Sequence, residues 1–150
     1  MKAKGLRPLG FYFKKKTQME KYLYFRTQAT LANDDASSDS FCVPLSSFLG
    51  MHPSADTQLK LFFIPQIRIS GGIDNNQDFT NADSVIMVLR EANTHKAAMR
   101  NLVKAFNKAS NFGSESSDSD FIVVGDDLEG TFIIPEFSSM GDIAIGAAFV

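Results

Sequence analysis

Helical periodicity occurs in one segment of this chain, and it restricts the fold more than any other feature. The apolar residues of that segment recur every three or four positions, at Ala98, Leu102, Val103 and Phe106. Thr94 suits the N-cap position before them, and Gly113 breaks the pattern after them. The other apolar segments are short and lie between turn residues, as in β-rich domains. The sequence therefore predicts a mainly β fold with one helix, of the α+β class.

Alternation of side chains marks the first strand, over residues 21–27. It places Leu23 and Phe25 on one face and the side chains of Tyr22, Tyr24 and Arg26 on the other. Further strands are expected at 41–49, 57–66, 85–89, 121–124 and 131–134, with a short strand or subunit-contact tail at 143–150. His52 and Pro53 are expected to end the second strand.

The segment 57–66 is apolar on both faces, with Leu59, Leu61 and Phe63 on one side and Phe62 and Ile64 on the other. Such a strand is expected to be covered twice, by a helix across a barrel or by a neighbouring subunit. The order of elements is strands, a helix and then a terminal hairpin. A small barrel or curled sheet capped by one helix is the simplest fold with that order.

Charge divides the chain into two parts. The first 18 residues carry six bases and no acid, and they read as a basic extension to a single domain at 19–150. Either translation starts at Met19, or the extension is an arm that folds or binds on assembly. The rest has 9 basic and 17 acidic residues, a net charge of −8. A nucleic-acid site on this acidic body must therefore be local.

One cysteine, Cys42, excludes an intramolecular disulfide and is expected to be a small buried side chain. No apolar run is long enough to cross a bilayer. We therefore expect the protein in the cytoplasm, with no membrane partner.

No catalytic, metal or cofactor site is predicted. Only His52 and His95 are available for a nucleophilic triad, and neither lies in a motif. One cysteine and two histidines do not make the usual zinc ligand sets. The spacing of Asp74, Asn76 and Asp78 resembles the start of a calcium loop, but Phe79 and Val85 occupy positions that require Gly and Glu. Asp126, Asp127 and Glu129 are read as residues of a solvated hairpin turn rather than as an acid-base pair. The chain is expected not to be an enzyme.

Two groups of residues are candidates for nucleic-acid binding. The first is a row of bases at every fourth helix position, at Lys96, Arg100, Lys104 and Lys108. It is either a surface for an anionic ligand or simply the solvated face of the helix. The second is the outer face of the first strand, Tyr22, Tyr24 and Arg26, since aromatic and arginine side chains stack on bases. Core or subunit packing is the alternative for this group.

Two segments resemble a protein family from marine metagenomes that derives from cyanophages. They are MEKYLYFRT at 19–27, with the acidic loop after it, and FIVVGDDLEGTFIIP at 121–135. The resemblance covers about residues 19–150. It implies an Sm-like (SH3-like) fold, which is a small, strongly bent β-barrel whose subunits close into rings and bind RNA or DNA. Sm proteins begin with a helix, whereas the helix here precedes the terminal hairpin, so no Sm ligand residue is transferred to a numbered position.

These observations lead to one expected function and one alternative. The chain is expected to be a non-catalytic, homo-oligomeric β-barrel module of phage origin that binds single-stranded RNA or DNA. The alternative is a virion structural protein, such as a capsid or tail decoration protein, which would have other virion proteins as partners.

Overall fold

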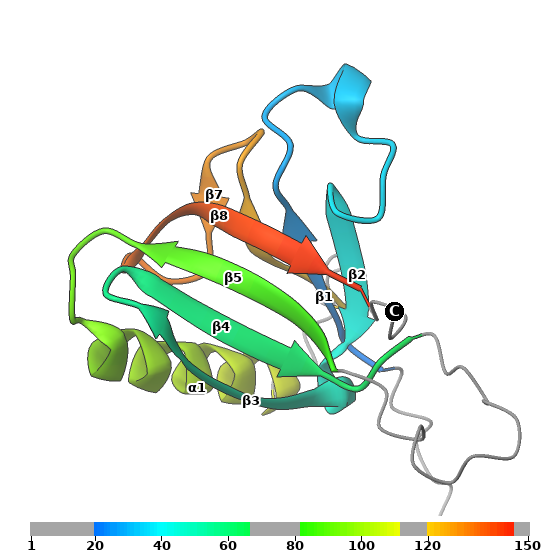
Figure 1. Ribbon diagram of the computed structural model, residues 1–150. Coiled ribbons are helices and arrows are strands. Elements are labelled where there is room, and N and C mark those ends of the chain that lie inside the picture. Colours follow the sequence, from blue (N-terminus) through cyan, green and yellow to red (C-terminus); the bar gives the residue numbers. More distant parts are fainter. Residues whose placement is uncertain (1–19, 67–81, 112–119, 146–150) are drawn as a thin grey trace, which may run out of the picture.

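The computed structural model describes residues 20–66, 82–111 and 120–145 (Figure 1). The basic extension at 1–18, the calcium-like loop at 74–79 and the end of the expected tail, 146–150, lie outside these residues. The described strands form two four-stranded sheets. The first sheet has the order β2 (Ser40–Pro44), β1 (Tyr22–Arg26), β6 (Phe121–Asp126) and β7 (Thr131–Phe132). The second has the order β3 (Phe48–Ala55), β4 (Gln58–Phe63), β5 (Asp83–Leu89) and β8 (Phe137–Ala144).

One α-helix, α1 (His95–Asn111), accompanies these strands, with short 3-10 turns at Leu31–Asn33 and Leu45–Ser47. The mainly β fold with one helix is thus confirmed. Over the described residues the strands close no barrel, because each sheet keeps two edge strands. The Sm-like barrel stays a prediction.

The first strand matches its alternating sequence. Leu23 and Phe25 are completely buried, while Tyr22 on the opposite face is exposed. β1 pairs antiparallel with β2 and parallel with β6, which lies about 100 residues later in the chain. The register of the parallel pair shifts at Phe25, which lies opposite Gly125. A Cβ atom at Gly125 would collide with Met140 and Met87, so this position accommodates only glycine without rearrangement.

The helix matches its periodicity. Ala98, Leu102 and Phe106 are buried, and the Phe106 ring packs edge-on against Phe48 of β3 at 5.3 Å between centroids. The helix lies beneath the second sheet in Figure 1. It begins directly after Thr94, whose carbonyl accepts the Ala98 N–H. The Thr94 hydroxyl donates to the Glu91 carbonyl at 2.8 Å, so the threonine fixes the chain that enters the helix.

The expected second strand, 41–49, is wrong as one element. It divides at the 3-10 turn Leu45–Ser47 into β2 of the first sheet and β3 of the second. The Ser47 hydroxyl donates to the Pro44 carbonyl at 2.6 Å and stabilises this turn. β3 then continues through His52 and Pro53, where an end was expected. Pro53 is tolerated because β3 is an edge strand that pairs only with β4.

Two further expectations concern the last strand and β4. The last strand begins at Phe137 rather than at 143. Within this chain β4 is covered on one face, because Leu59, Leu61 and Phe63 are completely buried whereas Phe62 is half-buried, and coverage of the second face by a neighbouring subunit stays a prediction. Ile64, on the same side as Phe62, is 39% exposed. The outer face of the second sheet is therefore partly apolar and partly open.

One hydrophobic core joins the two sheets and the helix. Phe25 and Phe41 of the first sheet contact Phe63 of the second sheet, with ring centroids 5.7 Å apart in both pairs. The binding surfaces described below lie on the outside of this core.

Candidate functional site

The predicted row of bases lies on the solvent face of α1, and we call it the basic stripe: Lys96, Arg100, Lys104 and Lys108. All four side chains are exposed. They lie opposite the buried face, which is formed by Ala98, Leu102 and Phe106. Since a helix rises about 1.5 Å per residue, the stripe extends over roughly 18 Å. Within the described part of the chain, none of the four forms an ion pair.

The charges of the basic stripe are not explained by helix stability. The first turn of α1 has no acidic residue, and Lys96 lies in that turn, where the helix dipole disfavours a cation. Only Lys108, in the last turn, is favoured by the dipole. Like charges four residues apart also repel each other by about 0.2–0.5 kcal/mol per pair. The arrangement therefore carries a small energetic cost that an anionic ligand would relieve.

The second predicted group is not brought together as expected, because Arg26 is not available to a ligand. Its side chain is 11% exposed and holds Asp126 through two hydrogen bonds, from Nε to Oδ1 at 2.8 Å and from an Nη atom to Oδ2 at 2.5 Å. Asp34 lies 3.8 Å away on the same guanidinium. Such two-pronged pairs fix geometry strongly. Arg26 has a structural role in this ion pair, which argues against base stacking by its guanidinium; the stacking role stays a prediction.

The two tyrosines do share an outward surface, which includes a residue that the sequence did not indicate. Tyr22 is 42% exposed, Tyr24 is half-buried, and Phe121 of β6 is 49% exposed. The Tyr24 and Phe121 rings lie 5.0 Å apart. We call Tyr22, Tyr24 and Phe121 the aromatic patch. Phe121 joins it through the parallel pairing of β1 with β6, a contact that local sequence patterns do not reveal.

The aromatic patch lies in acidic surroundings. Arg26, whose guanidinium carbon lies 5.9 Å from the Tyr24 ring centre, is already bound by Asp126. Burial raises the pKa of Tyr24, while the charge of Arg26 opposes that rise. Among the described residues, the base nearest to the Tyr24 ring is held by Asp126, so the patch offers ring surface while Arg26 is not free to pair with a phosphate. It is better suited to an apolar contact than to nucleic acid on its own.

The acidic hairpin residues lie in a turn, as interpreted, but the expectation of a solvated turn is wrong for two of them, because Asp126 is 2% exposed and Asp127 is half-buried. Asp126 Oδ1 accepts the N–H groups of Leu128 at 2.9 Å and Glu129 at 3.2 Å, which closes the turn after β6. Asp127 Oδ1 accepts the Met140 N–H at 2.8 Å. Burial raises the pKa of Asp127, and the neighbouring charge of Asp126 adds to the rise. These carboxylates hold the hairpin against β8.

The histidines are placed separately. His95 Nε2 lies 2.9 Å from the Ala55 carbonyl and 3.1 Å from that of Gln58, so it ties the start of α1 to the β3–β4 turn. His52 Nδ1 lies 2.8 Å from its neighbour's carbonyl, at Pro53. Cys42 is exposed, which corrects the expected burial. It faces outward because Phe41 and Val43 take the inward positions of β2.

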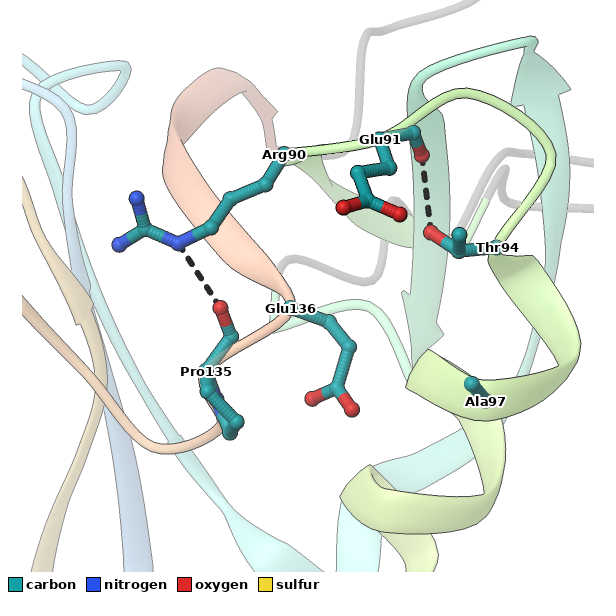
Figure 2. Close-up of a pocket in the computed structure, with 6 residues that line it drawn as sticks. All are labelled: Arg90, Glu91, Thr94, Ala97, Pro135 and Glu136. Carbon is teal, nitrogen blue, oxygen red and sulfur yellow. Dashed lines mark hydrogen bonds between the residues drawn. The ribbon is translucent and has the colours of Figure 1, made fainter.

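A pocket of about 310 Å³ opens between the start of α1 and the chain before β8 (Figure 2). Its lining residues are Arg90, Glu91, Thr94, Ala97, Pro135 and Glu136. The Nε atom of Arg90 donates to the Pro135 carbonyl at 2.8 Å and joins the two walls. No local sequence pattern indicates this pocket, because its two walls lie about 40 residues apart in the chain.

Among the described residues, no group of three or more His, Cys, Asp or Glu side chains is arranged to hold a metal ion. The helix that the structure describes lacks the length and apolar character needed to span a membrane. Comparisons with protein-family models, with curated proteins and with solved structures found no match to this chain. The basic stripe, the aromatic patch and the pocket are therefore the features that bear on function.

Proposed function

We propose that this protein is a non-catalytic module that binds single-stranded RNA or DNA along the basic stripe and assembles with copies of itself. The observation that carries the proposal is the exposure of Lys96, Arg100, Lys104 and Lys108 on one helix face with no ion pair among the described residues. Bases that neutralise phosphates release counterions, and this supplies most of the affinity of sequence-independent binding. The cost of placing these like charges on one face then has a functional reason.

Self-association is supported by the edge of the second sheet. β3 pairs on one side only, and its Leu49 side chain is 59% exposed. Ile64, directly after β4, adds a further exposed apolar side chain. Unpaired strand edges with apolar residues are surfaces where another chain can add. We include in the proposal that copies close into a ring, as the resemblance to the Sm-like family of cyanophage origin implies.

A second candidate function, a virion structural protein, is favoured by the aromatic patch. Tyr22 and Phe121 expose large apolar surfaces in acidic surroundings, which suits contact with another protein better than with a polyanion. Purified virus particles would separate the two candidates. A structural protein stays with the particle, whereas a nucleic-acid-binding module of the infected cytoplasm does not.

The test of the first proposal is fluorescence anisotropy of a labelled single-stranded oligonucleotide at increasing salt. The chain to use carries glutamine in place of the six bases of residues 1–18, so that they do not contribute. Four phosphate contacts predict a slope of log K against log salt of about −3, since each contact on a single strand contributes about −0.7. The double variant Arg100→Gln/Lys104→Gln should reduce that slope to about −1.4.

Lys60→Gln is the matched control, because Lys60 is a base of the second sheet outside the stripe. It should leave the slope unchanged. Equal affinity of the double variant and the control variant would contradict binding at the stripe. No binding at low salt by the glutamine-substituted chain would likewise contradict binding at the stripe, and no binding by the wild-type chain either would contradict nucleic-acid binding as such and leave the virion role.

A further inference from the structure

The pocket between α1 and the chain before β8 is lined by polar side chains, and only some of their polar groups form hydrogen bonds within the protein. It is lined by one base, two acids and one hydroxyl, with Ala97 and Pro135 as apolar wall residues. The Thr94 hydroxyl is engaged with the Glu91 carbonyl, and Arg90 Nε with the Pro135 carbonyl. The carboxylates of Glu91 and Glu136 are therefore the groups to consider.

The Glu136 carboxylate is only half satisfied. One oxygen, Oε1, accepts a hydrogen bond from the Asn101 amide of α1. The other, Oε2, is buried and has no hydrogen-bond partner. Buried carboxylate oxygens are normally paired, so an orphaned one is unfavourable and points to a missing donor. Glu136 also lines the pocket, so a donor group bound there would lie next to this carboxylate.

A second carboxylate, that of Glu91, favours a donor group with a positive charge. Glu91 lines the same pocket from the connection between β5 and α1, and Figure 2 shows its side chain extending from that connection. Together the lining side chains carry one positive and two negative charges. A pocket of about 310 Å³ is at the small end of ligand sites, and it admits a molecule of a few heavy atoms.

We propose that this pocket binds a small molecule through a primary ammonium group, which donates to Glu136 and is neutralised by Glu136 and Glu91. The apolar walls of Ala97 and Pro135 contact the carbon chain next to the nitrogen. The ammonium group can belong to a diamine or to an amino acid, whose carboxylate would meet Arg90. This inference does not rest on nucleic-acid binding, since the stripe lies on the exposed face of α1.

The test is an NMR titration of the full chain with putrescine, γ-aminobutyrate and butanoate in turn, with the backbone amide signals of Thr94 and Ala97 as the local readout. We expect saturable shifts with one or both amines and none with butanoate. Glu136→Gln keeps an acceptor for Asn101 but loses the charge, and it should weaken amine binding roughly tenfold or more. Glu91→Gln should also weaken amine binding. Because Glu91 is exposed, this variant should fold normally and keeps the test valid if Glu136→Gln does not fold.

Asp142→Asn is the control variant, because it removes the same charge from an exposed position of β8. It should leave amine binding unchanged. Tighter binding of γ-aminobutyrate than of putrescine would support an amino-acid ligand, and the reverse order a diamine. Shifts with butanoate alone, no saturable shifts, or equal amine binding by Glu136→Gln, Glu91→Gln and the wild type would overturn the proposal.

Discussion

A single carboxylate, that of Asp126, connects three parts of the structure. It accepts both hydrogen bonds from Arg26 of β1 and two backbone N–H groups of the turn that follows β6. Burial alone would raise its pKa, but these hydrogen bonds outweigh burial and lower the pKa of Asp126 below its ordinary value. The ionised form is therefore the one that the folded protein stabilises.

The substitution Asp126→Asn tests this role. It keeps the shape and an acceptor for the turn but leaves the buried guanidinium of Arg26 without its main counter-charge. Loss of one partner of a buried ion pair is strongly destabilising, and we expect a loss of about 3 kcal/mol at neutral pH, measured by urea denaturation. Asp142→Asn, at an exposed position, should change the stability by less than about 0.5 kcal/mol.

Comparison of the wild type with Asp126→Asn also predicts how the stabilisation by Asp126 depends on pH. Because the folded pKa of Asp126 is lowered, its contribution is present above the ordinary aspartate pKa of about 3.9 and is lost as pH falls through the folded value. The difference in stability between wild type and Asp126→Asn should therefore shrink below pH about 4. A constant difference across that range would contradict the ionic role.

At the scale of elements, β8 approaches β5 closely through one glycine. A Cβ atom at Gly141 would lie 2.7 Å from Ile86 Cγ2, closer than real Cβ atoms approach, and 3.1 Å from the Ile86 carbonyl oxygen, tighter than nine in ten such contacts. Since a backbone atom is involved, rotation of a side chain cannot relieve the contact. Gly141→Ala should lower the free energy of unfolding by about 2 kcal/mol. Ser139→Ala, on the same strand, is the control and should be near neutral; equal effects would argue against the close approach.

Elements with a strong local pattern were predictable from sequence. The helix and β1 follow from apolar periods of about 3.6 and two residues, because each element buries one face. The division between β2 and β3 was not, because 41–49 is continuously apolar or small. The break depends on the chain leaving one sheet for the other at Pro44, which is a tertiary event.

The candidate surfaces show the same limit. The basic stripe lies within one helix, so its four-residue spacing was sufficient to place it on one exposed face. The aromatic patch needs the pairing of Tyr22 with Phe121, and the partner of Arg26 is Asp126; both contacts join positions about 100 residues apart. No local period encodes such distances. Alternation predicts on which face of β1 the Arg26 side chain lies. It does not predict that Asp126 lies on that face and binds the guanidinium.

At the scale of the whole molecule, the shared hydrophobic core makes stability a property of both sheets. Phe25 of β1 is completely buried, and its ring contacts Phe41 of its own sheet and Phe63 of the other. Phe25→Ala should therefore lower the stability by about 4 kcal/mol through loss of burial and the cavity left behind.

Because one core joins all layers, unfolding should remain a single transition. With Tyr12 replaced by phenylalanine, tyrosine fluorescence reports the first sheet through Tyr22 and Tyr24, and the NMR methyl signal of Met51 reports β3 of the second. Coincident urea midpoints from the two probes, both shifted by Phe25→Ala, are expected, whereas a shift in the tyrosine signal alone would show that the two sheets unfold independently.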